Sequence, residues 1–359
     1  MISSSGVTGG GPILMSILND HLYKDFNFFF AIPHNEKTLI LFKKAIYKQI
    51  LNISERKIKI KELLYLSNYI KSNSIDIIHS HGKGAAFIGR LISLFLKKPH
   101  IYTFHGIHTK CHGKIYVLFY RIYEFIFGFI DSRKVFVSQS EKQFAKNNGI
   151  YFSNNYSIIH NGINPYDLQN KNEIRKKLRN RYKIDNLEKC IISVCRFVPQ
   201  KNIFELIEIA NLCRNYKFFL VGDGPLKSEI NIYIQKLNLK NIYLTGIITN
   251  VYDYLSACDL FLSTSIYEGL PLSIIEAMSV GLPIVASRVM GNIDTIEDRK
   301  TGFFYDLGNP IMAAEKIKLV LNNENILKEI GLKSKLRQKN CFDAKKMAEE
   351  YKKIYKSFI

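Results

Sequence analysis

The stretch Asp259–Ser287, DLFLSTSIYEGLPLSIIEAMSVGLPIVAS, contains the local pattern that decides the fold. Its first apolar run, DLFLSTS, predicts a buried strand, and the loop Glu268–Pro271 leads into a predicted helix, LSIIEAMSVG. Gly281 and Pro283 end that helix, and a second apolar run, PIVASRV, predicts the next strand. Strand, helix and strand in this order indicate parallel neighbours in a sheet that helices cover on both faces.

The same alternation runs through both halves of the chain. Strands are expected in the first half at FNFFFAI, IDIIHSH, HIYTFHG, KVFVSQS and YSIIHNG, and in the second half at CIISVCRF, KFFLVGDG, NIYLTGI, DLFLSTS, PIVASRV and GFFYDL. A chain of 359 residues suits two domains, so we expect an α/β protein with two doubly wound, Rossmann-like domains. The expected boundaries are an N-terminal domain at 1–165, a linker with a first surface helix at 166–188, a C-terminal domain at 189–340 and a C-terminal helix at 341–359.

Composition is that of a globular protein with an unusual charge. Hydrophobic residues make up 47% and charged residues 23%, whereas the net charge is +20, of which residues 1–170 carry +11. Such a chain is attracted to nucleic acid, nucleotide phosphates or an anionic membrane, although a lysine-rich composition alone could also give this charge. The six cysteines have irregular spacing, which favours reduced cytosolic thiols over a disulfide framework or a zinc ribbon.

Ligand sites of doubly wound domains lie at the carboxyl ends of the strands, so polar residues matter most there. In the first half the glycine-rich turn GVTGGGP, Gly6–Pro12, precedes a helical run and could bring backbone amides, including those of Gly10 and Gly11, close to a phosphate. A tight strand-to-helix turn explains the same glycines. The turn matches neither the dinucleotide-binding pattern G-x-G-x-x-G nor a P-loop.

In the second half two cations follow a predicted strand. Arg196 ends the strand in CRFVPQKN and Lys201 comes five residues later, before a helix, which suits a diphosphate. The sequence VGDGP, Val221–Pro225, is typical of a turn, and a ligand-binding loop is the second interpretation of it. The amides of Gly269 and Leu270 should lie at a helix N-terminus, ready for a phosphate.

Two carboxylates stand in the stretch Ser263–Ser287, which otherwise reads as core. Glu276 lies among apolar helix residues, where a carboxylate is costly unless hydroxyl or amide donors meet it, and a ribose diol would supply them. Glu268, in the loop, could reach a different part of the same ligand. The alternative is that both residues cap or form ion pairs locally.

Histidines gather at two predicted strand ends of the first half. His81 is the expected cleft-lining residue of HSH, and His105 stands in TFHG, where its strand-end position favours a functional role over a buried structural one. His108 and His112 are spaced as half a zinc site, but no further cluster of ligands accompanies them, so no metal site is expected.

Several of these motifs together resemble those of a known family. Arg196 with Lys201, VGDGP, and the pattern S-x-x-E-G-x-P-L-x-x-x-E-A-M-x-x-G-x-P-V/I-V-A-S from Ser265 to Ser287 are similar to the donor site of retaining family 4 glycosyltransferases of the GT-B fold. HSHGKGAAFIGRL, TFHG, VFVSQS and IIHNGIN extend the resemblance over the first half. The chain departs from the family at its start, where only Met1-Ile2 precede SSSG, so the first strand is shortened and a misplaced or truncated start is suggested.

The resemblance implies two domains that face a central cleft, the first on the acceptor side and the second binding the nucleotide sugar, with the C-terminal helix packing back on the first. In the second domain it implies that Arg196 and Lys201 hold the diphosphate and that Glu276 takes the ribose hydroxyls. Glu268 would contact the transferred sugar and serve, with His105, as a catalytic residue.

For the first domain the resemblance implies that His105 lies near the anomeric centre and that Gly10 and Gly11 approach the donor phosphates. Asn161 of HNG would line the cleft. No Asp-x-Asp occurs in the chain, which fits a metal-independent enzyme in which cations and helix N-termini stabilise the diphosphate leaving group. No cofactor is expected, because the nucleotide sugar is a substrate. Retention of configuration is implied by the resemblance alone.

Three other classes of protein share some of these sequence features. A nucleotide-sugar epimerase of the same fold is the main alternative and would turn over donor without acceptor. A nucleic-acid-binding protein has only the charge in its favour, since no base-reading or stacking module is present. An NAD-dependent oxidoreductase would need the glycine fingerprint that the chain lacks.

The acceptor is expected to be a polyprenyl-diphosphate-linked glycan of a bacterial surface polysaccharide, such as O-antigen or lipopolysaccharide. The charge of the first half, the basic segments LFKKAIYKQ and LFLKKPH, and the aromatic run Ile115–Phe129 favour a cytoplasmic protein that docks on the anionic inner face of the membrane. The alternative is that this run is a core helix with its aromatic side chains facing the sheet.

Overall fold

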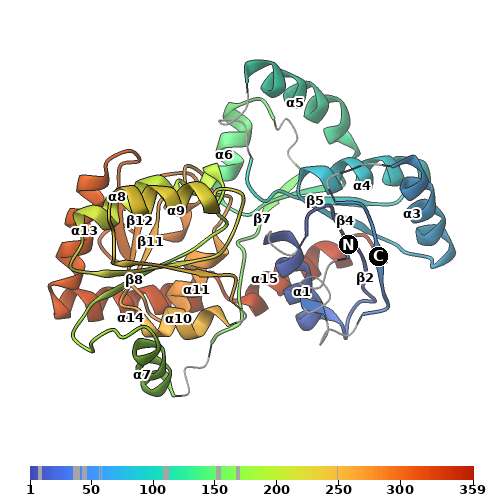
Figure 1. Cartoon of the computed structure of the whole chain (residues 1–359). Helices are drawn as coiled ribbons and strands as arrows, with labels where there is room; N and C mark the ends of the chain where they lie inside the picture. The colour runs from blue at the N-terminus through green and yellow to red at the C-terminus, as the bar shows by residue number, and fades with distance from the viewer. Residues whose placement is uncertain are drawn as a thin grey trace. The chain divides into compact units, whose positions relative to one another are not determined.

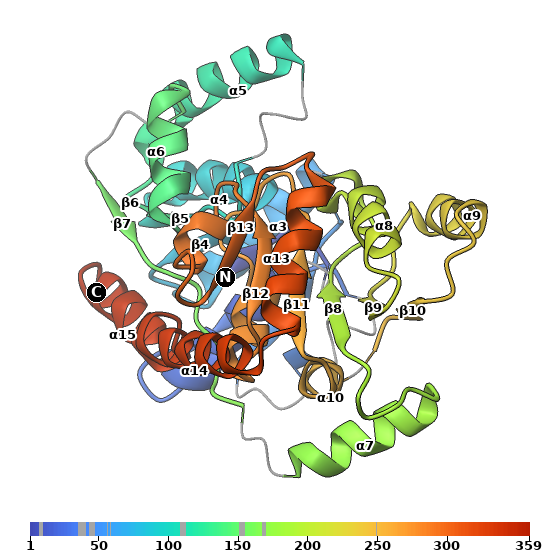
Figure 2. The same ribbon diagram turned by 90° about the vertical axis from the view of Figure 1, so that its left-hand side faces the viewer.

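The predicted apolar runs form parallel strands in both halves of the chain. The computed structural model describes residues 1–6, 10–34, 41–42, 47–55, 57, 59–107, 113–150, 155–166, 170–248 and 250–359. They form two units, Met1–Asn164 with Asp343–Ile359, and Pro165–Phe342. Each unit is a parallel sheet with helices on both faces (Figures 1 and 2), which confirms the predicted pair of Rossmann-like domains.

The first unit holds a seven-stranded sheet in the order β3-β2-β1-β4-β5-β6-β7. Its strands are β1 (Ile2–Ser3), β2 (Phe29–Ile32), β3 (Gln49–Asn52), β4 (Ile78–His81), β5 (His100–Thr103), β6 (Arg133–Phe136) and β7 (Tyr156–Ile158). Its helices are α1 (Gly10–Leu22), α3 (Ile60–Ser72), α4 (Lys83–Leu96), α5 (Lys114–Phe127), α6 (Gln139–Asn147) and α15 (Ala344–Lys356), with a short 3-10 turn η1 (Gly128–Ile130). The order reverses at β1 and β4, which is the switch point of a doubly wound sheet.

The second unit holds a six-stranded sheet in the order β10-β9-β8-β11-β12-β13. Its strands are β8 (Cys190–Val194), β9 (Lys217–Val221), β10 (Ile242–Gly246), β11 (Leu260–Ser263), β12 (Ile284–Ser287) and β13 (Gly302–Tyr305). Its helices are α7 (Lys171–Arg181), α8 (Ile203–Leu212), α9 (Lys227–Lys236), α10 (Val251–Ala257), α11 (Leu272–Ser279), α12 (Asn292–Thr295), α13 (Pro310–Leu321) and α14 (Glu324–Cys341), with a 3-10 turn η2 (Pro199–Lys201). The switch point lies between β8 and β11.

The pairing of β8, β11 and β12 shows why the apolar runs in Asp259–Ser287 predicted the fold. Leu262 pairs in register with Val285, and Phe261 with Ile192. All four side chains are almost completely buried. A strand covered on both faces cannot alternate apolar and polar residues, so the continuous apolar run is the expected signature.

The first sheet contains one strand that the sequence pattern did not predict. Strand β3, with the sequence QILN, is four residues long and its two ends are polar, so it carries too short an apolar run to be recognised. It pairs with β2 at the edge of the sheet. Strand β1 has only two residues, in line with the shortened first strand expected from the sequence.

The C-terminal helix α15 belongs to the first unit. Asp343 caps its start by accepting hydrogen bonds from the amides of Lys345 and Lys346, at 2.9 and 3.1 Å. Its buried face, which includes Tyr351 and Tyr355, packs in the core beside α1. Helix α7, in the segment expected to be a linker, packs on α10 and belongs to the second unit.

Candidate active site

The loop that follows β11 places Glu268 against Lys201. The Lys201 ammonium forms an ion pair and a hydrogen bond with Glu268 Oε1, and the hydroxyl of Ser265 donates to the same oxygen at 2.6 Å. Glu268 is only 7% exposed, so both partners offset the cost of burying its charge. The structure therefore brings together two residues that the sequence assigned to one ligand. Glu268 has an ion-pair partner, as the alternative interpretation required, but this partner lies 67 residues away in the sequence, and Glu276 has no ion pair among the described residues.

Backbone contacts hold this loop against η2. The amide of Ile266 donates to the carbonyl of Gln200 at 2.9 Å, and the Gln200 side chain donates to the carbonyl of Tyr267 at 2.9 Å. The hydroxyl of Thr264 donates to the carbonyl of Lys201 at 2.8 Å. Lys201 and Glu268 are thus fixed by a framework that does not depend on their own pairing.

Glycines permit the close packing around these residues. A Cβ on Gly291, whose φ is +82°, would lie 2.7 Å from the Cβ of Glu268. In the turn Val221–Pro225 a Cβ on Gly222 would strike the carbonyl oxygen of Cys195, and Phe197 donates its amide to the carbonyl of Asp223 at 2.9 Å. This turn therefore buttresses the segment that carries Arg196, a role the sequence pattern alone did not reveal.

Helix α11 begins directly after Gly269, Leu270 and Pro271. Pro271 occupies the N-cap position in an extended conformation and provides no side-chain cap for the amides of the first turn. Such a terminus attracts anions through its amides and the helix dipole. Arg196 follows β8 by two residues and is half-buried, so both cations and the helix start stand at the carboxyl ends of β8 and β11.

Glu276 differs from Glu268 because no side chain compensates it. It is half-buried on α11, and its carboxylate has no hydrogen-bond partner among the described residues. Burial raises the pKa of Glu276 to about 7. Nearby, Tyr252 is stacked on Tyr166 with ring centroids 4.1 Å apart, and its pKa is raised by burial and by the charge of Glu276. This carboxylate is ready to accept hydrogen bonds from a ligand.

In the first unit, three of the predicted residues meet at the ends of β1, β4 and β5. His81 Nδ1 lies 3.1 Å from His105 Nε2, and the two rings are stacked with centroids 5.4 Å apart. A Cβ on Gly11 would lie 3.4 Å from the Cβ of His81 and 3.9 Å from the His105 ring. These are ordinary contact distances, so the start of α1 packs beside both histidines.

Burial keeps these histidines neutral. It lowers the pKa of His105 to about 4, and it lowers the pKa of His81 and of its neighbour His79 well below the usual value. The Nε2 atom of His81 is buried without a hydrogen-bond partner in the described part of the chain. His79 instead bonds the hydroxyls of Tyr355 and Thr103 at 2.7 and 2.8 Å, so it is a satisfied structural residue.

Sequence reasoning missed Glu141, which positions the loop of His105. Its carboxylate accepts hydrogen bonds from the amides of Gly106 at 2.6 Å and Val137 at 2.9 Å, while its own amide donates to Ser138 at 3.1 Å. Ser138 and Glu141 thus form the S-x-x-E start of α6, a pattern of helix N-termini that was visible in VSQSE. Gly106 has a φ of +99°, which explains the glycine after His105.

The remaining predicted positions divide into two groups. Asn161 is buried after β7, and the adjacent Gly162 packs so closely on the start of α15 that a Cβ would lie 2.5 Å from the carbonyl oxygen of Asp343. Gly10 is the first residue of α1. The rest of the glycine-rich turn at 7–9, and the candidate zinc ligands His108, Cys111 and His112, lie outside the described residues.

Comparison with known proteins decides the family. Residues 174–337 match the family model of group 1 glycosyl transferases, and residues 33–166 match that of glycosyltransferase family 4. An uncharacterized glycosyltransferase of Methanocaldococcus jannaschii is 30% identical over 298 residues, which cover 80% of this chain and 77% of the relative. The chain is a family 4 glycosyltransferase.

Two further similarities concern this glycosyltransferase. The Escherichia coli UDP-Gal:alpha-D-GlcNAc-diphosphoundecaprenol alpha-1,3-galactosyltransferase is 26% identical over 315 residues, 82% of this chain and 79% of the relative. The crystal structure of Anabaena HepE in complex with UDP and glucose matches with a TM-score of 0.87 at 19% identity, over 99% of this chain and 98% of the other. The second likeness supports the GT-B fold.

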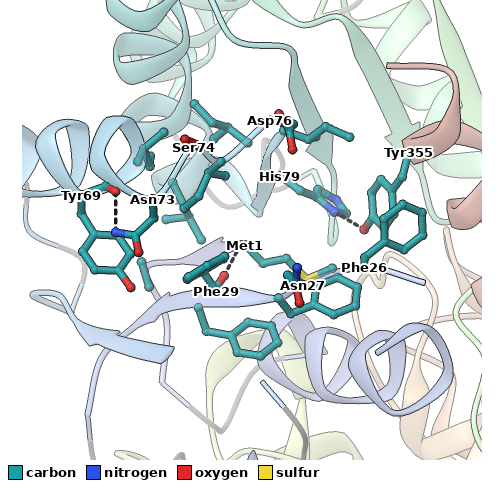
Figure 3. A pocket seen from close by; sticks show the side chains of 18 of the residues that line it. Met1, Phe26, Asn27, Phe29, Tyr69, Asn73, Ser74, Asp76, His79 and Tyr355 are labelled. Carbon is teal, nitrogen blue, oxygen red and sulfur yellow. Dashed lines mark hydrogen bonds between the residues drawn. The ribbon is translucent and has the colours of Figure 1, made fainter. Parts of the chain in front are cut away.

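The glycosyltransferase also has a cavity that lies away from the predicted donor site. A cavity of about 330 Å³ opens at the beginnings of β2 and β4, where Met1, Phe29, Tyr69 and Tyr355 line it (Figure 3). Ligands of doubly wound sheets bind at the opposite, carboxyl ends of the strands. The position of this cavity therefore does not match that of a ligand site in such a sheet.

The described residues of the glycosyltransferase contain neither a membrane-spanning helix nor a metal-binding group of side chains. None of the described helices combines the length and apolar character that a membrane span requires. Among the same residues no group of three or more His, Cys, Asp or Glu side chains is arranged to hold a metal ion.

Proposed function

We propose that this glycosyltransferase moves a hexosyl or N-acetylhexosaminyl group from a nucleotide-sugar donor to a polyprenyl-diphosphate-linked glycan, with retention of configuration and without a metal ion. The observation that carries the proposal is the cluster of Lys201, Glu268 and Ser265 beside the start of α11. It offers a cation, a carboxylate and helix amides within one short segment, which are the groups that a sugar diphosphate requires.

The diphosphate is the part of the donor that this site recognises through charge. We assign it to Arg196, Lys201 and the amides of Gly269 and Leu270 at the start of α11. When the bond to the sugar breaks, negative charge develops on the leaving phosphate, and these groups stabilise it in the transition state. In the first unit, Gly10 and Gly11 at the start of α1 are proposed to approach a phosphate of the donor.

The ribose is assigned to Glu276, because a diol can donate two hydrogen bonds to a carboxylate that has no other partner. Binding of the diol favours the ionised form and lowers the raised pKa of Glu276. The support for this role is the contrast with Glu268, whose charge is already compensated by Lys201.

In the second unit, the transferred sugar is assigned to Glu268. In the first unit, His105 is assigned a catalytic role toward substrate hydroxyl groups, and His81 and Asn161 are assigned to the acceptor side. A neutral imidazole can donate from one nitrogen and accept at the other, which suits neutral hydroxyl groups. Neither carboxylate is assigned as a nucleophile. We propose instead that the leaving phosphate accepts the proton of the acceptor hydroxyl on the same face of the sugar.

A lipid-linked acceptor is favoured by the relatives. The Escherichia coli relative is named for a diphosphoundecaprenol-linked acceptor, and a cytoplasmic protein at the membrane's inner face could reach such a substrate. We therefore place this enzyme in the assembly of a bacterial surface polysaccharide, such as O-antigen. The epimerase alternative is not favoured, because the relatives are named as glycosyltransferases.

A transfer assay tests the proposal. The purified chain is incubated with a panel of UDP, GDP and ADP sugars and a short polyprenyl-diphosphate-linked acceptor, and the product is analysed by mass spectrometry and proton NMR. We expect one sugar added to the acceptor in the α configuration from an α-linked donor. Donor epimerisation in the absence of acceptor, or a product of inverted configuration, would contradict the proposal.

A further inference from the structure

Helix α5 has two apolar faces, although only one of them is covered. Its inner face packs on the first unit through Tyr120, Glu124 and the following Gly128, all of which are buried. The outer face carries exposed large apolar side chains, with Phe119 exposed by 67%, over the whole length of the helix and into η1. They are Ile115, Leu118, Phe119, Ile122, Phe125, Ile126 and Phe129, which we call the α5 surface.

The spacing of these residues makes the α5 surface continuous. Their positions follow steps of three and four, so they form one stripe along the helix. In both overall views α5 lies at the periphery of the first unit, beside α6 (Figures 1 and 2). The aromatic run is therefore not a core helix with all its rings toward the sheet. About half of the run faces outward.

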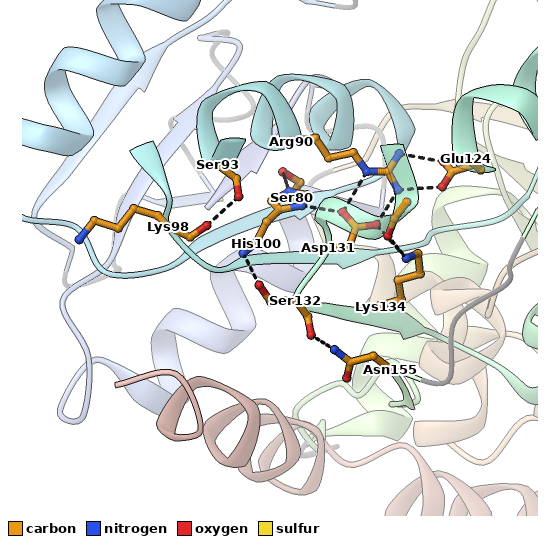
Figure 4. Close-up of polar contacts among 11 residues, drawn as sticks. Ser80, Arg90, Ser93, Lys98, His100, Glu124, Asp131, Ser132, Lys134 and Asn155 are labelled. Carbon is orange, nitrogen blue, oxygen red and sulfur yellow. Dashed lines mark hydrogen bonds and ion pairs between the residues drawn. The ribbon is translucent and has the colours of Figure 1, made fainter. Parts of the chain in front are cut away.

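A buried ionic cluster fixes which face of α5 points outward. Arg90 of α4 holds Glu124 with contacts of 3.2 and 2.7 Å, and it holds Asp131 with contacts of 2.9 and 2.6 Å (Figure 4). His100 contacts Asp131 at 2.8 Å, and Lys134 lies 3.3 Å from it. Rolling α5 to bury the outer stripe would break the Arg90–Glu124 pair and leave buried charges unpaired, which is strongly unfavourable.

The charges of α5 indicate the occupant of this surface. Its exposed charged residues, Lys114 and Arg121, are both cationic, and its sole carboxylate, Glu124, is buried against Arg90. Lys83 of α4 does not belong to this face, because its ammonium lies 4.2 and 4.0 Å from the ring centres of Tyr116 and the buried Tyr120, on the covered side of the helix. A second copy of the chain would oppose this face with the same positive charges. An anionic lipid surface instead complements both the cations and the apolar stripe.

We propose that the α5 surface is a membrane-docking element that lies flat in the headgroup region of an anionic bilayer. Aromatic and branched side chains enter the boundary between headgroups and acyl chains, while Lys114 and Arg121 contact lipid phosphates. The biological purpose rests on the proposed function, since docking brings the enzyme to its lipid-linked acceptor. The binding itself depends on neither donor nor acceptor.

Vesicle flotation with the full chain tests this proposal. Vesicles of phosphatidylglycerol and phosphatidylcholine are compared with vesicles of phosphatidylcholine alone, at low and high salt. We expect the protein to float with the anionic vesicles only, and less at high salt. The double variant Phe119→Glu/Phe125→Glu should reduce the floated fraction at least tenfold, and alanine at Lys114 and Arg121 should reduce partitioning by about fivefold for each lost cation.

A matched control places glutamate at two equally exposed apolar positions of the second unit. Ile232→Glu/Ile311→Glu replaces side chains that are 65% and 62% exposed, and it should float like the parent. Circular dichroism and urea unfolding verify that both double variants are folded. Flotation of Phe119→Glu/Phe125→Glu at the parent level would overturn the proposal.

Other outcomes separate this proposal from its alternatives. If the parent sediments as a dimer that Phe119→Glu/Phe125→Glu dissociates, and neither protein floats, then the α5 surface is a contact between copies and the proposal is wrong. If the parent fails to float but still transfers sugar, only the docking is overturned. Flotation without transfer would uphold the docking and overturn the proposed function.

Discussion

The carboxyl ends of the two sheets carry opposite chemistry. In the second unit, charged groups gather at β8 and β11, where Lys201 is paired with Glu268 and Glu276 stands uncompensated. In the first unit, the ends of β4 and β5 carry His81 and His105, which burial keeps neutral. This difference is what the proposed function requires, with a charged diphosphate at one sheet and neutral hydroxyl groups at the other.

The same contrast gives the two sites opposite effects on stability over one range of pH. Glu276 binds a proton more readily in the folded chain, so its contribution to the unfolding free energy falls as the pH rises from 4.5 to about 7. His105 binds a proton less readily when folded, so its contribution rises as the pH increases from about 4 to 6.5. Variants at the two positions should therefore change the pH profile in opposite directions.

The largest effect is expected from Lys201→Ala, which removes the cation of the second site. The rate of sugar transfer should fall by roughly 10²–10³, the loss expected when a group that stabilises developing negative charge is removed. Steady-state kinetics measure this, with urea unfolding alongside because Glu268 loses its partner. Lys333→Ala, which breaks the exposed pair with Glu329, is the control. Parent-level transfer by Lys201→Ala would mean that the diphosphate site is elsewhere.

Glu276→Gln should remove the carboxylate that has no partner. Above pH 7.5 the variant should be more stable than the parent by up to about 3 kcal/mol, because the parent must hold an ionised buried group there. Below pH 4.5 the two proteins should unfold alike in urea. Calorimetry adds a ligand test with the nucleoside diphosphate that the transfer assay identifies: the parent should bind it more tightly than its 2′-deoxy form, whereas the variant should bind both equally. If the parent binds the nucleoside diphosphate and its 2′-deoxy form with equal affinity, Glu276 does not contact the 2′-hydroxyl of the ribose.

His105→Gln should raise the free energy of unfolding relative to the parent in acid, whereas Glu276→Gln raises it above pH 7.5. At pH 5 the parent is weakened because its unfolded chain takes up a proton at His105, and the variant escapes this loss, worth about 2 kcal/mol. Urea unfolding at pH 5 and pH 7.5 measures the difference, and replacing the exposed His34 by Gln serves as the control. A steeper loss of stability in acid for His105→Gln than for the parent would contradict a buried neutral histidine.

The smallest effect is expected from chelation. Transfer should proceed at the parent rate in EDTA, because Arg196, Lys201 and the start of α11 supply the positive charge that a metal ion would otherwise bring. The assay is repeated after dialysis against chelator, with Mg²⁺ or Mn²⁺ added back. Loss of transfer that either ion restores would show that the cationic residues are insufficient, and it would weaken the contrast between the two sites.

Local patterns predicted much of this protein. The apolar runs that became β8, β11 and β12 were recognisable because strands buried on both faces need continuous apolar sequence. Strand β3 was not predicted, because QILN is short and polar at both ends. The positions of Arg196, Lys201 and Glu268 followed from their places at strand ends, since all carboxyl ends of a parallel sheet share one edge.

Pairings over long sequence distances could not be predicted in this way. Nothing local in the sequence links Lys201 to Glu268, Gly106 to Glu141, or Arg90 to Glu124, because each pair meets only after the strands have taken their order in the sheet. The pattern S-x-x-E marked Glu141 as the start of a helix but gave no sign that its carboxylate would hold the loop of His105.

Periodicity and short motifs were enough to predict the two parallel sheets, the family and the residue types of the candidate donor site. Tertiary structure decided which charges are compensated and which are left for a ligand. It also decided which face of α5 is exposed: both stripes of that helix are apolar, so the sequence allowed either to be buried. The buried pair of Arg90 and Glu124 settles the choice, since a buried carboxylate requires its partner.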